Sequence, residues 1–438
     1  MKRFTKATRV LSVAALTVMG AGLAACGGGG GGGGGESGGA DSVTSAKGPI
    51  KIWYSNNEFE VKWGKAMVES WNSAHPDEKI DAQEIPAGKS SEEVIGAAIT
   101  AGNAPCLVFN TAPVAVPQFQ KQGGLVALDD FPDGAQYVKD RTGDLADQYK
   151  SSDGKMYQLP WKSNPVVLFY NKDMFTKAGL DPEKPKLGTH KELLETARAL
   201  VAAGAAPNAL WPSPASDFFQ AWFDFYSFYA ANSDGTPLVK DGKATFDSEQ
   251  GKQVATMFET LYKENLASKE VYQGDSFLEG KAAMSLAGPW AIAAYKGKIN
   301  WGAVPVPAAE ANPKTSTFSD AKNVAMYSAC ENQGTAWEVM KFATSKEQDG
   351  KLLTDTGQMP MRKDLATAYS DYFAKNPAYT QFAEQAARTV EVPNVANSVE
   401  VWQTFRTAYA KSVIFGNESI DTAFKGAADK INQLVAQK

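Results

Sequence analysis

The stretch "PVVLFYNKDMFTKAG", residues 165–179, shows the unit from which the chain is built. Its apolar run up to Tyr170 is typical of a buried strand. Residues 172–178 then begin a helix, and Gly179 is placed to end it, because glycine adopts the left-handed conformation at a helix end without strain. The stretch therefore predicts a strand followed by a short helix.

The same unit recurs along the chain. "PIKIWYS", residues 49–55, alternates in the manner of a strand, and Trp63, Met67 and Trp71 follow it at helical spacing. "CLVFN", residues 106–110, is a further buried-strand candidate. Other helices are predicted from a capping box at Ser90 and Glu93, from a second at Asp247 and Gln250, and from apolar spacing over residues 420–435. Strands that alternate with helices predict α/β layers with mostly parallel sheets.

The N-terminus has the layout of an export signal. Four basic residues within the first nine precede an apolar run over residues 10–23 and small residues before Cys26. The apolar run is shorter than the about 20 residues that span a bilayer. "LAAC", residues 23–26, resembles the bacterial lipobox, in which the cysteine receives a lipid. We expect residues 1–25 to be a removed lipoprotein signal peptide.

Nine consecutive glycines, residues 27–35, follow this cysteine. A phosphate-binding loop alternates glycine with other residues between a strand and a helix, whereas an uninterrupted run is a flexible coil. We expect residues 26–48 to be a lipidated cysteine with a glycine-rich tether. The remaining protein would then work at the extracellular face of the cell membrane.

The composition is that of an ordinary globular protein. About 390 residues follow the tether, which is enough for two domains. The 44 basic and 49 acidic residues leave no basic excess that would favour nucleic acid. Cys106 and Cys330 could form one disulfide in an oxidising compartment, and two buried free thiols explain them equally well.

Enzyme signatures are incomplete. "GKS", residues 88–90, lacks the glycine that a phosphate-binding loop has five residues earlier, because Gln83 stands there. His75 and His190 lie in polar, turn-like surroundings and are expected at the surface, so they predict neither a zinc site nor a catalytic triad. We expect no metal and no cofactor. A glycosidase needs only two carboxylates, so that alternative stays open.

The ten tryptophans are more informative. Trp63, Trp71 and Trp337 fit a helical period and are expected in the core. Trp161, Trp290 and Trp402 lie at turns or beside polar residues, where an indole could stack on the apolar face of a sugar ring. Polar side chains that follow predicted strands would complete a binding site, because ligands of α/β sheets collect there. These are Asn56, Asn57, Glu58, Asn110, Thr111 and Asn164.

Four blocks of sequence resemble, in this order, the extracellular solute-binding proteins of ATP-driven sugar importers, the group that includes maltodextrin-binding protein. The blocks are "DGKMYQLPW" with "VVLFYNKDMFTKAGL" (153–180), "FLEGKAAMSLAGPW" (277–290), "GTAWEVMKFATSKE" with "TGQMPMRKD" (334–364), and "VPNVANSVEVWQTFRTAY" with "SIDTAFKGAADKIN" (392–432). The resemblance implies a two-lobed periplasmic-binding-protein-like fold. Each lobe would be a mostly parallel sheet flanked by helices, and a multi-strand hinge would join them.

The resemblance also implies how the chain divides. The first lobe would comprise residues 49–162 and 317–370, and the second lobe residues 163–316 and 371–438. An oligosaccharide would bind between the lobes and pass unaltered to the permease subunits of an ABC transporter. We expect a monomer without nucleic-acid partners.

The resemblance also implies individual site residues, position by position. Trp290 and Trp402 would be stacking platforms in the second lobe, and Phe219 falls where the family has another ring. Arg406 would reach a sugar hydroxyl, and Asn164 matches a carboxylate of the maltodextrin binder. Lys162 and Trp211 are further candidates.

Some positions depart from the family pattern. Cys106 stands where the family usually has aspartate, and Asn110 stands where the maltodextrin binder has tryptophan. Asp320 replaces a small residue at the crossover and is a new candidate for hydrogen bonding to the ligand. These changes concern the identity of the sugar rather than the fold.

The sequence therefore predicts a lipid-anchored oligosaccharide receptor that is not an enzyme. One alternative is a surface glycoside hydrolase, which would release reducing ends from a glycan. The other is the same fold with a peptide or another polar solute as ligand. The wealth of aromatic rings favours the sugar.

Overall fold

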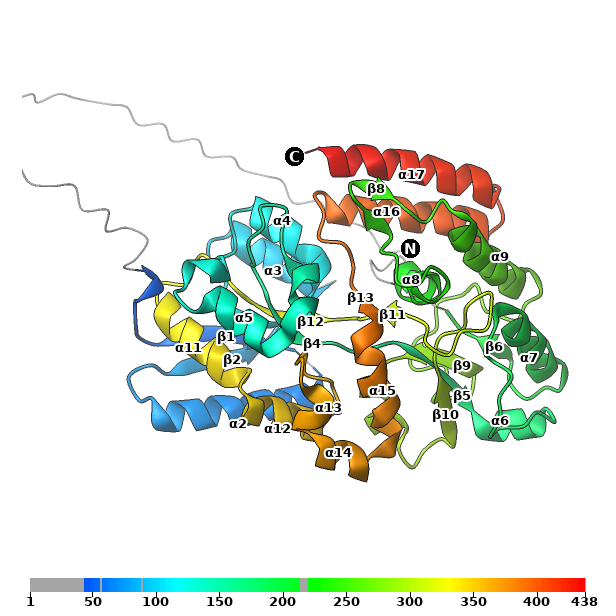
Figure 1. Cartoon of the computed structure of the whole chain (residues 1–438), viewed down its shortest axis with the longest axis horizontal. Helices are drawn as coiled ribbons and strands as arrows, with labels where there is room; N and C mark the ends of the chain where they lie inside the picture. The colour runs from blue at the N-terminus through cyan, green and yellow to red at the C-terminus, as the bar shows by residue number, and fades with distance from the viewer. Residues whose placement is uncertain (1–42, 56, 88–89, 213–219, 438) are drawn as a thin grey trace, which may run out of the picture. The chain divides into compact units, whose positions relative to one another are not determined.

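The computed structural model describes residues 43–55, 57–87, 90–212 and 220–437, and the side chains of residues 220–222 are left out. Cys26, Asn56 and Phe219 lie outside the described residues. The predicted strands and helices are present, with α-helices and strands alternating over most of the chain (Figure 1). In the described part, no helix is both long enough and apolar enough to cross a bilayer.

The first sheet has the strand order β2-β1-β3-β12-β4. Its strands are β1 (Ile50–Tyr54), β2 (Ile80–Glu84), β3 (Leu107–Thr111), β4 (Leu159–Lys162) and β12 (Lys322–Met326). β1 pairs in parallel with β2 and β3, whereas β12 runs antiparallel to β3 and β4. Because β4 leaves the first sheet and β12 returns to it, the two strands run in opposite directions.

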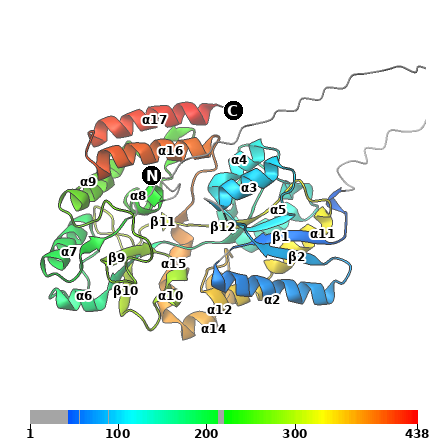
Figure 2. The ribbon, with the colours of Figure 1, turned by 180° about the vertical axis from the view of Figure 1, so that it is seen from behind.

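Helices cover both faces of the first sheet because the side chains of its strands alternate. Leu107 and Phe109 point to one cluster and Val108 to the other. The first face packs against α2 (Glu58–Ala74), α5 (Gly134–Thr142), α11 (Gln333–Ala343) and α12 (Lys346–Thr356), and the second against α3 (Ser91–Thr100) and α4 (Val116–Lys121). Figures 1 and 2 show α2 and the α3–α4 pair on opposite sides of this sheet.

The second sheet has the strand order β10-β5-β9-β6. Its strands are β5 (Val167–Asn171), β6 (Asn208–Leu210), β9 (Ala282–Ala287) and β10 (Trp301–Val304). β5 is antiparallel to β9 and β10, and β6 is parallel to β9. Both sheets are thus mixed, and the prediction of mostly parallel sheets is wrong in this respect.

The side chains of the second sheet also alternate between its two faces, and a different group of helices packs on each face. Leu168 and Tyr170 face one cluster, and Val167 and Phe169 face the other. The first cluster takes in α6 (Lys172–Lys177), α7 (His190–Ala202), α8 (Gln220–Asn232), α9 (Glu249–Lys263), α16 (Ser398–Tyr409) and α17 (Ile420–Ala436). The second takes in α10 (Trp290–Tyr295), α13 (Leu365–Ala368), α14 (Ser370–Lys375) and α15 (Thr380–Gln385). The short strands β7 (Val239–Lys240) and β8 (Lys243–Ala244) form a separate hairpin.

Two chain segments that connect the sheets are hydrogen-bonded to each other. Residues 163–166 lead from β4 to β5, and residues 319–321 lead from β11 (Thr317–Phe318) to β12. The N–H of Asn164 donates to the carbonyl of Ser319 at 2.7 Å, and that of Val166 donates to Phe318 at 3.1 Å. β13 (Thr389–Val390) lies parallel to β11 and adds a third segment. The crossover therefore consists of chain segments that are hydrogen-bonded to one another.

Glu391, which follows β13, is buried at this crossover. Its carboxylate accepts the backbone N–H groups of Val392 at 2.7 Å and Ala321 at 3.1 Å, and its carbonyl accepts the hydroxyl of Tyr226 at 2.8 Å. Burial raises the pKa of Glu391 to about 8 despite these amides and the charge of Lys322. The folded chain therefore favours the protonated form at neutral pH.

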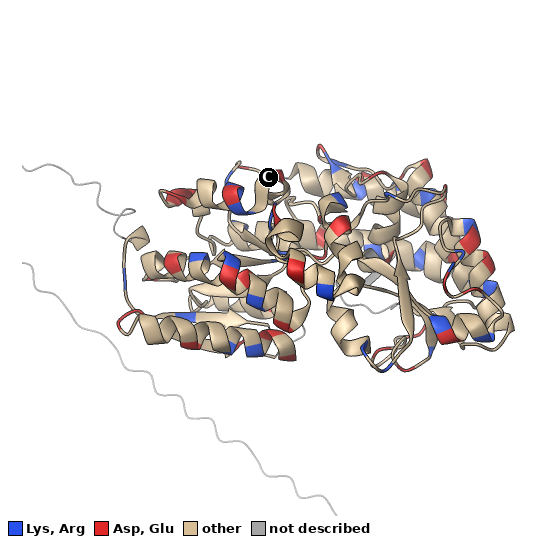
Figure 3. Ribbon diagram, turned by 60° about the horizontal axis from the view of Figure 1, so that its bottom comes forward, with Lys and Arg blue, Asp and Glu red and all other residues tan. Residues whose placement is uncertain are grey.

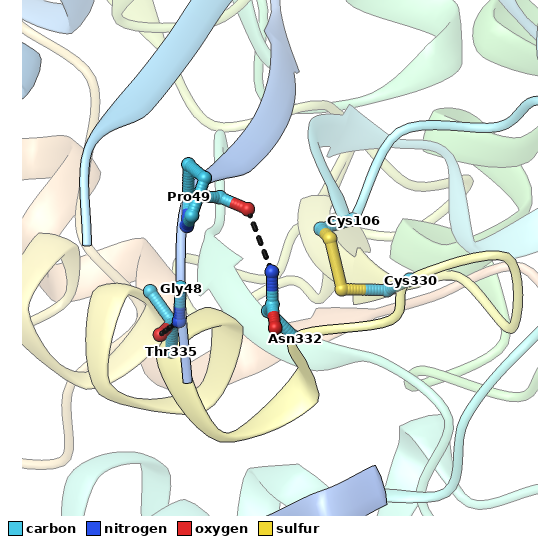
Figure 4. The surroundings of a disulfide bond; sticks show 6 residues. All are labelled: Gly48, Pro49, Cys106, Cys330, Asn332 and Thr335. Atoms are coloured by element: carbon cyan, nitrogen blue, oxygen red, sulfur yellow. Dashed lines mark hydrogen bonds between the residues drawn. A yellow bond between two sulfur atoms is a disulfide. The ribbon is translucent and has the colours of Figure 1, made fainter. Parts of the chain in front are cut away.

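Cys106 and Cys330 form a disulfide, which the sequence left undecided. Cys106 directly precedes β3, and Cys330 follows β12, the neighbour of β3 (Figure 4). Next to it, the side-chain amide of Asn332 donates to the carbonyl of Pro49 at 2.9 Å. The start of β1 is thereby tied to the same corner of the first sheet.

Two local predictions are corrected. The helix cap near residue 248 is Ser248, whose hydroxyl accepts the N–H of Gly251, while Asp247 pairs with Lys252. His190 is 7% exposed, because the first turn of α7 packs against Phe228, and burial lowers its pKa to about 4.

On the outer helices, acidic and basic residues are mixed (Figure 3).

Candidate ligand-binding site

A cavity of about 420 Å³ lies at one edge of the second sheet. β6 ends at Leu210 and β9 ends at Ala287, and these two strands are parallel, so their carboxyl ends meet at this edge. Trp211 directly follows β6, and Trp290 opens α10 after β9. Two tryptophans predicted as site residues are thereby brought to one cavity.

Aromatic rings line this cavity. The ring centroid of Trp211 lies 4.9 Å from that of Tyr272, and its indole N–H donates to the carbonyl of Glu270 at 2.7 Å. The rings of Trp290 and Phe223 are 6.3 Å apart. Both indoles are only half-buried, so part of each ring is accessible. Such rings can stack on the apolar face of a bound molecule.

Gly288 fixes the position of the Trp290 ring. A Cβ atom at residue 288 would lie 1.9 Å from that ring. Only glycine therefore lets the indole lie against the backbone of this turn.

Two carboxylates contribute to the lining. Asp224, on α8, is 9% exposed, and burial raises its pKa to about 8. Asp275 accepts the N–H groups of Phe277 at 3.1 Å and Leu278 at 2.9 Å, so backbone amides hold it in place. The cavity thus combines apolar rings with oxygen atoms that accept hydrogen bonds.

A second group of predicted residues lies at the end of β4. The ammonium of Lys162 is buried against Glu60 and lies 4.6 Å from the ring centroid of Trp161. Burial lowers the pKa of Lys162, and Glu60 opposes this shift. The amide of Asn164 donates to Gln358 at 3.4 Å, and its own oxygen has no partner among the described residues. These groups join β4 to α2 and to the loop after α12.

The other polar candidates lie near the first sheet. Asn57 caps α2 by accepting the N–H groups of Phe59 and Glu60, and Glu58 is exposed beside it. Asn110, the last residue but one of β3, has a φ of 80°, and the hydroxyl of Thr111 is buried against Tyr327. Asp320 pairs with Lys322 at 2.8 Å.

Residues 57–350 match the family described as bacterial extracellular solute-binding protein. The chain belongs to this family. Maltodextrin-binding protein MdxE of Bacillus subtilis is 26% identical over 356 residues, which cover 77% of this chain and 79% of the relative. The sn-glycerol-3-phosphate-binding periplasmic protein UgpB of Escherichia coli is 25% identical over 434 residues, which cover 91% and 94% of the two chains.

A solved structure supports the fold of this solute-binding protein. The cyclic alpha-maltosyl-1,6-maltose binding protein from Arthrobacter globiformis matches 90% of this chain and 100% of that one, with a TM-score of 0.74 and 21% identity. The periplasmic-binding-protein-like fold predicted from the sequence is thereby confirmed. In this fold, the crossover segments described above are the hinge.

Two tryptophans predicted to face the ligand are buried in this solute-binding protein. Trp161 is 0% exposed, and its ring centroid lies 5.3 Å from those of Trp63 and Phe109. Trp402 is 2% exposed within the cluster of the second sheet. A stacking platform needs a free ring face, so neither ring serves as one in this structure. Arg406, one turn beyond Trp402, is half-buried.

Sequence reasoning missed Asp224, Tyr272 and Asp275. A signal for Asp224 was present, because it is an acidic residue inside the aromatic run of residues 211–229. Tyr272 and Asp275 lie in a loop whose position depends on the packing of the second sheet. Among the described residues, no group of three His, Cys, Asp or Glu side chains could hold a metal ion.

Proposed function

We propose that this protein binds an oligosaccharide outside the cell and delivers it to the permease of an ABC importer. The observation that carries the proposal is the cavity at the carboxyl edge of β6 and β9, where the rings of Trp211, Trp290 and Tyr272 accompany the carboxylate of Asp224. A sugar ring has an apolar face that stacks on indoles and hydroxyl groups that form hydrogen bonds with a carboxyl group. The rings of the cavity can provide the stacking contact, and Asp224 can provide the hydrogen bonds.

The hinge supports a mechanism of capture by closure. We place the lobe boundaries at residues 49–162 with 317–370, and 163–316 with 371–438. A ligand held in the second lobe would gain contacts to the first lobe only when the hinge closes, and closure therefore follows binding. Asn57, Glu58 and Asn110 are the first-lobe groups that we assign to this contact. A micromolar affinity corresponds to about −8 kcal/mol, which suits capture followed by release.

The N-terminal sequence supports a lipid anchor at Cys26. Acyl chains contribute about 0.8 kcal/mol per buried methylene, and two or more chains hold a protein on a membrane. The glycine run at residues 27–35 would give the binding domain freedom to meet the permease. We expect the parent protein in the membrane fraction and a Cys26→Ser variant in the soluble fraction. An equal distribution of both proteins would exclude the anchor.

The lining disfavours a phosphate ester as the ligand, and a direct assay tests the alternative of a glycosidase. A phosphate ester, as in the name of the relative UgpB, would meet Asp224 and Asp275 without a basic residue among the described residues of the cavity. A glycosidase would need those carboxylates as an acid and a nucleophile, and this activity can be tested directly. Reducing ends released from a glycan by the purified protein would overturn the binding assignment.

Calorimetry against a panel of oligosaccharides tests the proposal. We expect binding by the parent and a loss of about tenfold in affinity for Trp290→Ala and for Trp211→Ala, because truncating an aromatic anchor typically costs more than 1 kcal/mol. Trp301→Ala is the matched control, since this half-buried tryptophan of β10 lies outside the cavity. If both cavity variants bind as tightly as the parent, the site is wrongly assigned.

A further inference from the structure

The carboxylate of Asp224 is exceptional among the deeply buried acids of the described chain. Asp349 is paired with Arg141 and Arg362, and Glu60 is paired with Lys162. Glu391 accepts two backbone N–H groups, as described above. Asp224 has neither a hydrogen bond nor an ion pair to any described residue. Burial raises the pKa of Asp224 to about 8, so the free group is largely protonated at neutral pH. A buried polar group without a hydrogen-bond partner is costly even when it is neutral, so a partner from outside the chain is expected.

We propose that this cavity selects a saccharide with a protonated amino group, which pairs with the carboxylate of Asp224 between the aromatic rings. The inference rests on the proposed function and names its ligand class, an amino sugar. The amine would donate the hydrogen bonds that Asp224 lacks, and the sugar ring would stack on Trp290 or Trp211.

The composition of the lining favours a cation over a neutral or anionic group. The described residues of the cavity include Asp224 and Asp275 and no Lys, Arg or His. Tryptophan and tyrosine rings attract ammonium groups through their negative faces. Among the described residues, such contacts occur with Lys162 over Trp161 at 4.6 Å and Lys341 over Trp337 at 5.5 Å. The cavity offers the same surroundings without supplying its own cation.

Asp275 provides an internal comparison. It lines the same cavity, but Oδ1 of its carboxylate already accepts the N–H groups of Phe277 and Leu278. Asp224 has no such compensation, and burial holds its pKa near 8. An ammonium group beside Asp224 would restore its ionised form. The preference for an amine should therefore depend on Asp224 much more than on Asp275.

Calorimetry with three matched trisaccharides tests the inference. The β-1,4-linked trimers of glucosamine, N-acetylglucosamine and glucose differ at one substituent, and only the first carries ammonium groups; the three monosaccharides repeat the comparison without a linkage. We expect the amine to bind roughly 10- to 100-fold more tightly than its neutral partners, which is the contribution of one charge-assisted hydrogen bond. Asp224→Asn should abolish this preference, and Asp275→Asn should retain it. Asp224→Ser, checked for folding by circular dichroism, serves as a second variant.

The outcomes separate the inference from the proposed function. If neutral oligosaccharides bind as tightly as the amine, or if Asp224→Asn and Asp224→Ser keep the preference, the inference is overturned and the proposed function stands. If no saccharide of either panel binds, both are overturned. A preference that is lost in Asp224→Asn and kept in Asp275→Asn supports both.

Discussion

Replacing Glu391 by Gln should make the stability of the protein less dependent on pH. In the folded chain Glu391 keeps its proton up to a pH of about 8, because burial raises its pKa, whereas the unfolded chain loses the proton near the ordinary value of 4.5. Between these two values the folded state binds more protons. The free energy of unfolding therefore falls as pH rises through this window. A glutamine amide cannot ionise and removes this contribution.

The size of the effect follows from the two pKa values. At about 1.4 kcal/mol per tenfold change in proton affinity, a rise from 4.5 to about 8 corresponds to roughly 5 kcal/mol over the whole titration. Between pH 5 and pH 8, about 3 to 4 kcal/mol of stability would be lost. As pH increases over the same range, the free energy of unfolding of Glu391→Gln should rise by this amount relative to that of the parent.

Urea unfolding at pH 5, 6, 7 and 8, followed by tryptophan fluorescence and circular dichroism, measures this difference. At each pH, subtracting the free energy of unfolding of the variant from that of the parent removes the contributions of other titrating groups. Glu310→Gln is the matched control, because Glu310 is exposed in a loop and should change nothing. If the stability difference between Glu391→Gln and the parent is constant over this pH range, the argument from burial at the hinge is refuted.

Three further predictions concern buried groups. Asp349→Ala should cost about 3–5 kcal/mol in urea unfolding, because it leaves Arg141 buried without its carboxylate; a loss below 1 kcal/mol would contradict this. Burial lowers the pKa of His190 to about 4, so as pH falls from 6.5 the unfolded chain binds the proton before the folded chain does. Between pH 7 and pH 4 the free energy of unfolding of the parent should therefore fall by about 3 kcal/mol more than that of His190→Gln. If the free energies of unfolding of the two proteins change equally over this pH range, the prediction is contradicted. Reducing the Cys106–Cys330 disulfide, which links residues 224 apart, should cost about 2–5 kcal/mol and lower the melting temperature; an unchanged melting temperature would contradict it.

Local patterns in the sequence were enough to predict most of the individual elements. The apolar run at residues 107–109 became β3, and Trp63, Met67 and Trp71 became the buried face of α2. Gly179 ends α6 in the left-handed conformation that its position predicted. These features depend on neighbours within a few residues, so the sequence carries them directly.

Features that depend on distant parts of the chain were predicted less well. The antiparallel pairing of β12 follows from the path of the chain between the two sheets, and no local pattern contains that path. His190 lies in a polar segment, yet the packing of α7 buries it. Trp161 comes directly before a lysine, which made it look accessible, but Lys162 is itself buried against Glu60. Burial in each case was decided by a partner far away in sequence.

The same limit applies to the candidate site. Trp211 and Trp290 were each predicted as site residues, and only the parallel pairing of β6 and β9 brings them to one cavity. Asp224 stands out in the sequence as an acid within an aromatic run, but its significance is the absence of a partner among the described residues. Such an absence is visible only once the neighbours of a side chain are known.

The disulfide also has a consequence for cleavage by proteases. Its two cysteines lie before and after the part of the chain that forms the second sheet, residues 163 to 316. A protease that nicked a surface loop of that part would leave both fragments covalently attached. The nicked protein would still migrate as one species on a non-reducing gel.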